Sequence, residues 1–265
     1  MKGLLCIFIL LSLCACSTTK KIGTSKNKQV EMQLYIDELN QLYTLKQNNT
    51  LTKYDKEAKL LFEVSDNTLG RINVLDVSNP LQILAFHKNF QIVKIFDRTM
   101  TLNARIDLNR LNLFEIRTVA SANDNRIWVF DELNQELLKI DKNGNVQGRN
   151  NDLRLRLTSN ATPYRIIEYQ NTVYMFDEVH GILICNAFGE YVRNRDFDYG
   201  KTFSYWQGKV FIQNENTLVV YDLPTGEVRS QEIKTSAAKG RDFHLIDGQL
   251  IYIDAEETIQ IKSNL

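Results

Sequence analysis

Short runs of β-branched and aromatic residues alternate with polar corners along the chain beyond Val30. The runs recur as pairs, in which one strand-like run ends at a polar corner and the second often ends in Asp. Apolar runs of this length, bounded by Asn, Asp and Gly, indicate β-strands joined by turns, and helical periodicity is scarce. The pairs are 41–45 with 51–55, 81–86 with 92–97, 126–131 with 137–141, 172–177 with 181–185, 209–212 with 218–222, and 249–254 with 258–261.

The six pairs are regularly spaced. With Leu42, Ile83, Ile127, Val173, Val210 and Ile251 as equivalent positions, the intervals are 41, 44, 46, 37 and 41 residues. Each interval holds further strand candidates, before the pair (164–168, 242–246) and after it (59–64, 228–233). Four short strands repeated every 40–50 residues or so are typical of β-propeller blades, which bury their faces by packing on one another.

We therefore predict an all-β fold, a six-bladed β-propeller, over residues 31–265. A sandwich or barrel is the structural alternative, but it does not account for six copies of one hairpin. The last unit has no obvious fourth strand, and we expect residues 26–30 to supply it. Ring closure of this kind removes exposed strand edges.

Local motifs carry resemblances to known propellers. Ile127–Asp141 and Val173–Cys185 resemble strand pairs of the YWTD and NHL kind, without the Tyr-Trp-Thr-Asp motif itself. Residues 222–227 resemble the turn of PQQ-type repeats, as in BamB-like outer-membrane lipoproteins, without their tryptophan ladder. Residues 31–265, with the run 73–84, resemble uncharacterised propeller lipoproteins of the Bacteroidota. That resemblance implies a fold and a compartment, and no activity.

Residues 1–15 have the layout of a signal peptide, with Lys2 followed by an apolar run over 4–13. That run is shorter than the roughly 20 apolar residues that span a bilayer. Because Ala15 is small and Cys16 follows it, 13–16 resembles a bacterial lipobox, which implies cleavage and a lipidated Cys16. The alternative is an ordinary signal peptide with an incidental cysteine.

Residues 16–30 are polar and unpatterned, and we predict a flexible tether there. They carry Lys20, Lys21, Lys26 and Lys28 and no acidic residue. Near a bilayer, each lysine would gain about 1 kcal/mol from anionic headgroups, whereas a solvated linker needs no such role. Ser17 replaces the Asp associated with inner-membrane retention, and 18–21 lack the acidic cluster of surface-exported lipoproteins. The resemblance therefore implies an outer-membrane anchor facing the periplasm and an outer-membrane protein partner.

Charge and motifs exclude several function classes. The chain has 32 Lys and Arg against 32 Asp and Glu, which argues against a nucleic-acid partner.

Once the signal peptide is removed and Cys16 is lipidated, Cys185 alone remains in the propeller, in an apolar run that predicts a buried thiol. Nucleophile-elbow, Walker, zinc-helix and dinucleotide motifs are absent. We expect no catalytic residue, no metal and no cofactor.

The central channel is where a propeller could still bind a ligand. The predicted inner-strand segments are 71–74, 117–119, 164–166, 203–205 and 242–244. They supply Arg165, Tyr205 and His244 as candidate channel residues. His87 and His180 are predicted to lie at outer or turn positions. Two functions follow: a membrane-anchored, non-enzymatic interaction scaffold, or a propeller that binds or cleaves a carbohydrate or peptide in its channel.

Three polar patterns have a structural and a functional interpretation. The acidic pairs 37/38, 131/132, 177/178 and 254/256 are expected to cap turns on one rim, or else to form an acidic patch. Asp141–Asn145 is expected to be a hairpin turn rather than a calcium loop. Residues 153–157 are expected to be a strand with Arg154 and Arg156 on one side, either as a solvated outer strand or as a basic contact stripe.

Overall fold

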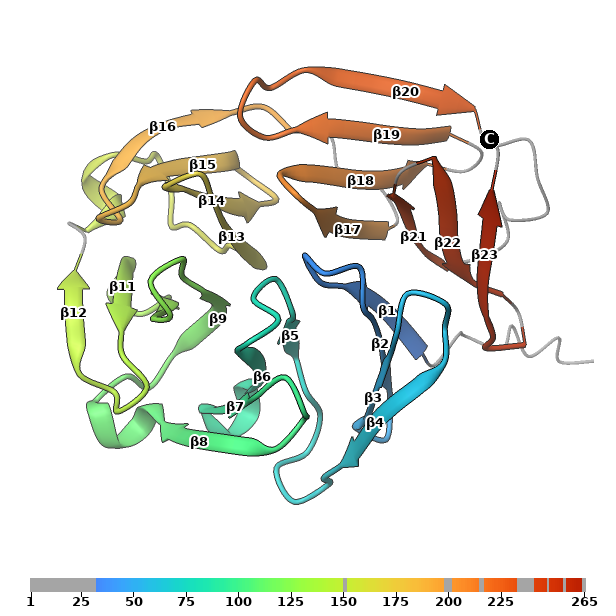
Figure 1. The fold of residues 1–265 in the computed structure, drawn as a ribbon. Coiled ribbons are helices and arrows are strands. Elements are labelled where there is room, and N and C mark those ends of the chain that lie inside the picture. The colour runs from blue at the N-terminus through green and yellow to red at the C-terminus, as the bar shows by residue number, and fades with distance from the viewer. Residues whose placement is uncertain are drawn as a thin grey trace, which may run out of the picture.

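A computed structural model describes residues 32–149, 152–197, 202–214, 217–232, 241–246, 248–254 and 256–263. These residues form six antiparallel sheets, five of four strands and one of three. The sheets stand in a ring, each with its first strand near the centre and its last strand outside (Figure 1). The predicted six-bladed β-propeller is confirmed.

The strands follow one another in sequence order from the centre of each blade outward. Blades 1 to 3 consist of β1 (Met32–Ile36), β2 (Leu42–Lys46), β3 (Thr50–Tyr54) and β4 (Leu60–Ser65); β5 (Val74–Asp76), β6 (Ile83–His87), β7 (Ile92–Phe96) and β8 (Leu102–Asp107); and β9 (Ile116–Ser121), β10 (Ile127–Asp131), β11 (Glu136–Ile140) and β12 (Val146–Arg149). Blades 4 to 6 consist of β13 (Arg165–Tyr169), β14 (Thr172–Asp177), β15 (Gly181–Asn186) and β16 (Tyr191–Arg195); β17 (Thr202–Trp206), β18 (Lys209–Asn214), β19 (Thr217–Asp222) and β20 (Val228–Glu232); and β21 (Arg241–Ile246), β22 (Gln249–Ile253) and β23 (Ile259–Ser263). Three short 3-10 helices, η1 (Lys88–Phe90), η2 (Leu108–Leu111) and η3 (Leu153–Leu155), lie between strands of blades 2 to 4.

The six predicted pairs are the second and third strands of the six blades. The runs expected before and after the pairs are the first strands and, in blades 1 to 5, the fourth strands. In blade 2 the inner strand begins at Val74, so Arg71 and Ile72 precede it and do not belong to it. The predicted closing strand at 26–30 lies outside the described residues.

The hydrophobic core lies between the blades. Leu45 of blade 1 packs in one cluster with Leu75 and Ala85 of blade 2. Phe86 of blade 2 likewise shares a cluster with Val129 of blade 3. Each sheet thus buries its faces against its two neighbours, which is why a blade needs the ring.

The two faces of the ring carry different loops. The hairpin face holds the turns between first and second strands and between third and fourth strands. The crossover face holds the turns between second and third strands and the connections between blades. Asp55, Asp97 and Asp141 stand at the hairpin face, where each Oδ1 accepts bonds from backbone N–H groups two and four residues on. The hairpin interpretation of Asp141–Asn145 is therefore confirmed.

The acidic pairs also cap turns, as expected. Asp37 Oδ1 accepts bonds from the backbone N–H groups of Leu39 and Gln41. The prediction that the four acidic pairs lie on one rim is wrong, however. Asp37 follows a first strand, whereas Asp131, Asp177 and Asp254 end or follow second strands, and neighbouring antiparallel strands end on opposite faces.

Residues 153–157 are not a strand. Asp152 caps η3 by accepting a bond from the backbone N–H of Arg154, and Leu153 is buried. Because this side-chain cap favours a helical turn, Arg154 and Arg156 do not share one face of a strand. Among the described residues, no helix has both the length and the apolar character to cross a membrane.

Side-chain amides fasten blades 1 to 3 to their successors on the crossover face. Gln91 and Gln135 have left-handed backbones. The amide of Gln91 bonds the backbone N–H and C=O of Ile116 in blade 3, at 2.8 and 3.1 Å. Gln135 does the same to Ala161 before blade 4, and Asn49 bonds Gly70 and Ile72 before blade 2. We call these three residues the amide clamps.

Candidate functional site

Arg165 crosses the centre of the ring. From β13 in blade 4, its Nη1 donates to the carbonyl of Leu75 in blade 2 at 3.2 Å. Its guanidinium carbon lies 6.0 Å from the ring centre of Tyr35 in blade 1 and 5.6 Å from that of Phe203 in blade 5. Contacts with both aromatic rings hold the cation in place. Arg165 therefore fastens four blades together at the axis.

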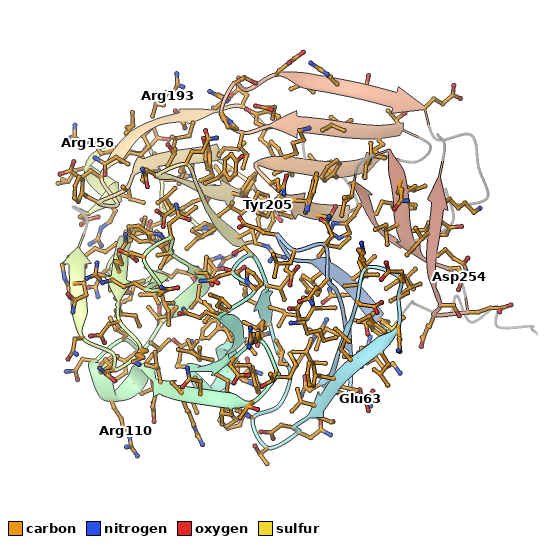
Figure 2. The ribbon with its side chains drawn as sticks, viewed as in Figure 1. Glu63, Arg110, Arg156, Arg193, Tyr205 and Asp254 are labelled. Atoms are coloured by element: carbon orange, nitrogen blue, oxygen red, sulfur yellow. The ribbon has the colours of Figure 1, made fainter. Side chains whose placement is uncertain are left out.

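Tyr205 and His244 lie beside Arg165. Figure 2 places Tyr205 near the centre of the ring. Burial raises the pKa of its hydroxyl. His244 is 2% exposed, and its Nε2 donates to the carbonyl of Leu34 at 3.3 Å, which links blade 6 to blade 1. Burial lowers the pKa of His244 to about 4, so the imidazole is neutral near pH 7.

The three predicted channel residues line one cavity of about 40 Å³. That volume suits a few water molecules, since a water needs roughly 10–15 Å³ measured in this way. Pockets for organic ligands are typically about 300–1,000 Å³. The three residues predicted from the sequence therefore do line one cavity. That cavity is too small for a sugar ring or a peptide.

The other singled-out residues have structural surroundings. His87 is buried at the end of β6 with Nδ1 3.2 Å from the Gly70 carbonyl, so its predicted outer or turn position is wrong. His180 does lie in a turn, between Asp177 and Ser159. Cys185 is buried as predicted, and burial raises the pKa of its thiol to about 12. Within the described ranges, no three His, Cys, Asp or Glu side chains form a metal-binding group.

The larger hollows lie on the hairpin face. One hollow, of about 680 Å³, follows the junction of blades 3 and 4. A second, of about 260 Å³, leads toward the axis beside Glu38 of blade 1. Asn123 and Glu168 line both hollows, which therefore adjoin. We call the two together the polar trough; its other lining residues include Asp124, Arg126, Lys139, Gln147, Arg149, Asn171, Phe188 and Glu190.

A rigid network forms the floor of the trough. Trp128 is buried, and its Nε1 donates to Glu168 Oε2 at 2.6 Å. Lys139 Nζ lies 4.3 Å from the centre of the Trp128 ring and donates to Asp124 and to the Ala187 carbonyl, both at 3.2 Å. Because these contacts join blade 3 to blade 4, the charges of the floor hold fixed positions before any partner binds.

The walls of the trough are exposed and mixed in character. Arg149, Asn171 and Glu190 reach solvent, and the Phe188 side chain is 78% exposed on the turn after β15. At the axial end, burial and the neighbouring carboxylates of Asp37 and Asp76 raise the pKa of Glu38. A surface with both charge signs, amides and one free aromatic ring suits a polypeptide segment.

Sequence reasoning missed the trough because it is assembled from four blades. Lys139 had a signal in the repeat, since Lys53, Lys94 and Lys139 occupy third strands at intervals of 41 and 45 residues. No sequence pattern marked Glu168, because its role depends on a hydrogen bond from Trp128, 40 residues earlier.

Comparisons with known proteins support the fold alone. No family model and no curated protein sequence matches the chain. Among solved structures, a streptogramin B lyase is 13% identical, with a TM-score of 0.55, and the match covers 88% of this chain and 82% of the lyase. The chain is a six-bladed β-propeller.

Two further similar structures belong to larger proteins or assemblies. PorZ of Porphyromonas gingivalis, described as an essential bacterial surface component of the type-IX secretion system, is 13% identical with a TM-score of 0.54. That match covers 86% of this chain and 30% of the PorZ chain. A chain of the mitotic checkpoint complex is 13% identical with a TM-score of 0.52, over 86% of this chain and 72% of that one. Since the same fold serves an enzyme and assembly components, function depends on the site.

Proposed function

We propose that this protein is a membrane-anchored, non-enzymatic lipoprotein that acts as an interaction scaffold or accessory subunit of an outer-membrane complex. In this proposal Cys16 carries the lipid, residues 16–30 form the tether, and the propeller faces the periplasm. A polypeptide segment of the partner binds in the polar trough. The support for the anchor is the lipobox resemblance in 13–16.

The observation that carries the proposal is the contrast between the axis and the hairpin face. Arg165 crosses the axis and leaves a cavity of about 40 Å³, whereas the trough offers hollows of about 680 and 260 Å³. A carbohydrate or peptide ligand of the channel, the alternative function, would have to displace Arg165 from Leu75 and from two aromatic rings. Binding on the hairpin face requires no such rearrangement.

The similar structures favour an assembly role in general terms. One is described as a surface component of a secretion system and another as a complex. The likeness to a lyase supports the competing class, and at 13% identity it carries the fold and no catalytic residues.

A crosslinking experiment in native membranes tests the proposal. A photo-crosslinking amino acid replaces Phe188 in the trough or, as a control, Val228 on the outer strand β20; both side chains are exposed. We expect one adduct of constant mass from position 188 and none from position 228. Charge reversal with Arg126→Glu and Arg149→Glu should abolish that adduct, and the partner should co-purify in fixed proportion after mild detergent extraction.

The anchor is tested separately. Cys16→Ser should leave an uncleaved precursor or release the protein from the membrane fraction, and labelled fatty acid should not be incorporated. A variant that fractionates and migrates like the wild type would show that Cys16 carries no lipid. A propeller that stays monomeric after gentle extraction, with no position-188 adduct, would overturn the scaffold role.

A further inference from the structure

Large apolar side chains protrude from successive loops of the crossover face in blades 2 to 4. Each of five consecutive loops around this half of the ring presents one, exposed by 47% to 78%: Phe90, Phe114, Leu133, Leu155 and Val179. Their loops alternate between turns within a blade and connections between blades. We call these five residues the apolar crescent.

Hydrogen bonds join the successive loops that carry the crescent. Asn109 Nδ2 donates to the Phe90 carbonyl, and the Glu132 N–H, next to Leu133, donates to the Glu115 carbonyl, next to Phe114. The Leu153 N–H donates to the Gln135 carbonyl, which holds η3 and Leu155 beside the turn of Leu133. Ser159 and His180 join the last connection to the turn of Val179.

The rest of this face differs within the described residues. The equivalent turn of blade 1 reads Gln47-Asn48-Asn49, and the turn of blade 6 runs from Asp254 to Thr258. Exposed single apolar residues are ordinary, but five on consecutive loop tips are not scattered. The crescent therefore faces a surface with an apolar component.

The position of the tether identifies that surface. β1 begins at Met32, paired with Lys46 at the end of β2, so the first described residue of the propeller lies on the crossover face. As a random coil, residues 16–31 would reach roughly 20–25 Å. If residues 16–31 are tether throughout and do not supply the closing strand of blade 6, a lipid on Cys16 holds this face closer to the bilayer than the hairpin face.

We infer that the apolar crescent rests on the lipid bilayer and orients the propeller with its hairpin face, and the trough, away from the membrane. The inference rests on the proposed lipid anchor and on residues 16–31 being tether rather than a closing strand. Phe, Leu and Val on loop tips enter the interfacial layer, where apolar burial is favourable. The exposed carboxylates of Glu115 and Glu178, beside Phe114 and Val179, keep the contact shallow because they must stay hydrated. Arg110, 86% exposed and at the periphery in Figure 2, can reach anionic headgroups.

Fluorophores on single introduced cysteines test this orientation. The lipidated, full-length protein is reconstituted into vesicles of phosphatidylethanolamine and phosphatidylglycerol. Leu155→Cys and Val179→Cys report on the crescent, and Phe188→Cys and Leu39→Cys on the hairpin face. The exposures are matched at 78% and 72% against 78% and 63%. Cys185 is buried and does not compete for the label.

We expect nitroxide-labelled lipids to quench the crescent labels at least threefold more strongly than the hairpin-face labels, and aqueous iodide to do the reverse. Equal quenching at all four positions on vesicles that retain the protein would overturn the crescent while leaving the anchor intact. Shielding of the crescent in native membranes but not on vesicles would assign it to a protein partner and also overturn the inference. Failure of the protein to float with the vesicles would instead refute the anchor.

Discussion

The junctions that follow blades 1, 2 and 3 are held by different side-chain contacts from the junction of blades 4 and 5. The first three blades use polar groups: the buried amide clamps Asn49, Gln91 and Gln135, and, on the third strands, the buried Lys53 and Lys94 and the partly buried Lys139. The junction of blades 4 and 5 uses aromatic rings instead. Phe176 packs edge-on against Phe197 and Phe203, with ring centres 5.2 and 4.8 Å apart.

The two kinds of junction show two ways in which blades built from one repeat pack specifically on their neighbours. In blade 4, Ile184 occupies the third-strand position that Lys139 holds in blade 3, opposite Tyr174 where blade 3 has Trp128. Ring packing adapts to small changes in shape, whereas an amide with two backbone partners has one geometry. The polar junctions should therefore tolerate shape-conserving substitutions less well than the aromatic one.

The largest effect is expected from emptying the aromatic junction. Phe176→Ala should lower the free energy of unfolding by about 4 kcal/mol, because it leaves a cavity among Phe197, Phe203 and Tyr164. Phe176→Leu should cost only about 1.5 kcal/mol, since leucine refills most of the space. Urea titration of both variants measures the difference. Similar costs for the two would show that ring geometry, and not volume, holds this junction.

Breaking an amide clamp should come next. Gln135→Leu should cost about 3 kcal/mol, because Ala161 N–H and C=O lose their partners while they stay buried. Gln170→Leu is the matched control: Gln170 is exposed and also has a left-handed backbone. If both substitutions destabilise the protein equally, the cost comes from the backbone, and the clamp contributes little.

The clamps also mark what sequence could and could not predict. The ring, its six pairs and their period followed from alternating runs, because the two middle strands of each blade are buried and read as apolar. The clamps are single amides in turns already rich in Asn and Gln, such as 47–49, and nothing local separates them from solvated ones. Only their recurrence one residue before the third strand carried information.

The misplaced features have a common physical cause. His87 ends a strand next to a turn, and its burial depends on the Gly70 carbonyl of a distant loop. Residues 153–157 alternate like a strand, but the Asp152 cap decides the helix locally. The trough forms where segments 40 to 48 residues apart meet, and the crescent forms where successive loops about 20 residues apart meet. Contacts between repeats are therefore what a single repeat cannot reveal.

The contribution of the junction of blades 6 and 1 to the free energy of unfolding should depend on pH. His244 has an ordinary pKa of 6.5 when unfolded and about 4 when folded. Below pH 6.5 the unfolded chain takes up the proton first, so stability is lost as the pH falls from 6.5 toward 4. This loss should reach about 2.5 kcal/mol at pH 4.5.

Substitution separates this loss from general acid unfolding. His244→Gln should flatten the stability profile between pH 7.5 and 4.5, as measured by urea titration at each pH. His87, whose pKa burial also lowers, should contribute in the same direction, so the double variant with His87→Gln should be flatter still. A His244→Gln profile parallel to the wild type would mean that the imidazole reaches solvent.

The smallest effect separates two lysines at equivalent positions. Lys53 is 2% exposed, donates to the Arg98 carbonyl at 2.8 Å, lies 5.2 Å from the centre of the Tyr43 ring, and has its pKa lowered by burial. Lys139 is less buried, and it has a carbonyl, the carboxylate of Asp124 and the Trp128 ring as partners. The Asp124 carboxylate is the partner that Lys53 lacks, so Lys139→Met should cost about 1 kcal/mol through the lost charge-assisted hydrogen bond. Lys53→Met should be neutral or stabilising, because removing a buried ammonium relieves its desolvation. Urea titration of both variants is the measurement, and the opposite order would show that full burial strengthens the lysine junction and does not weaken it.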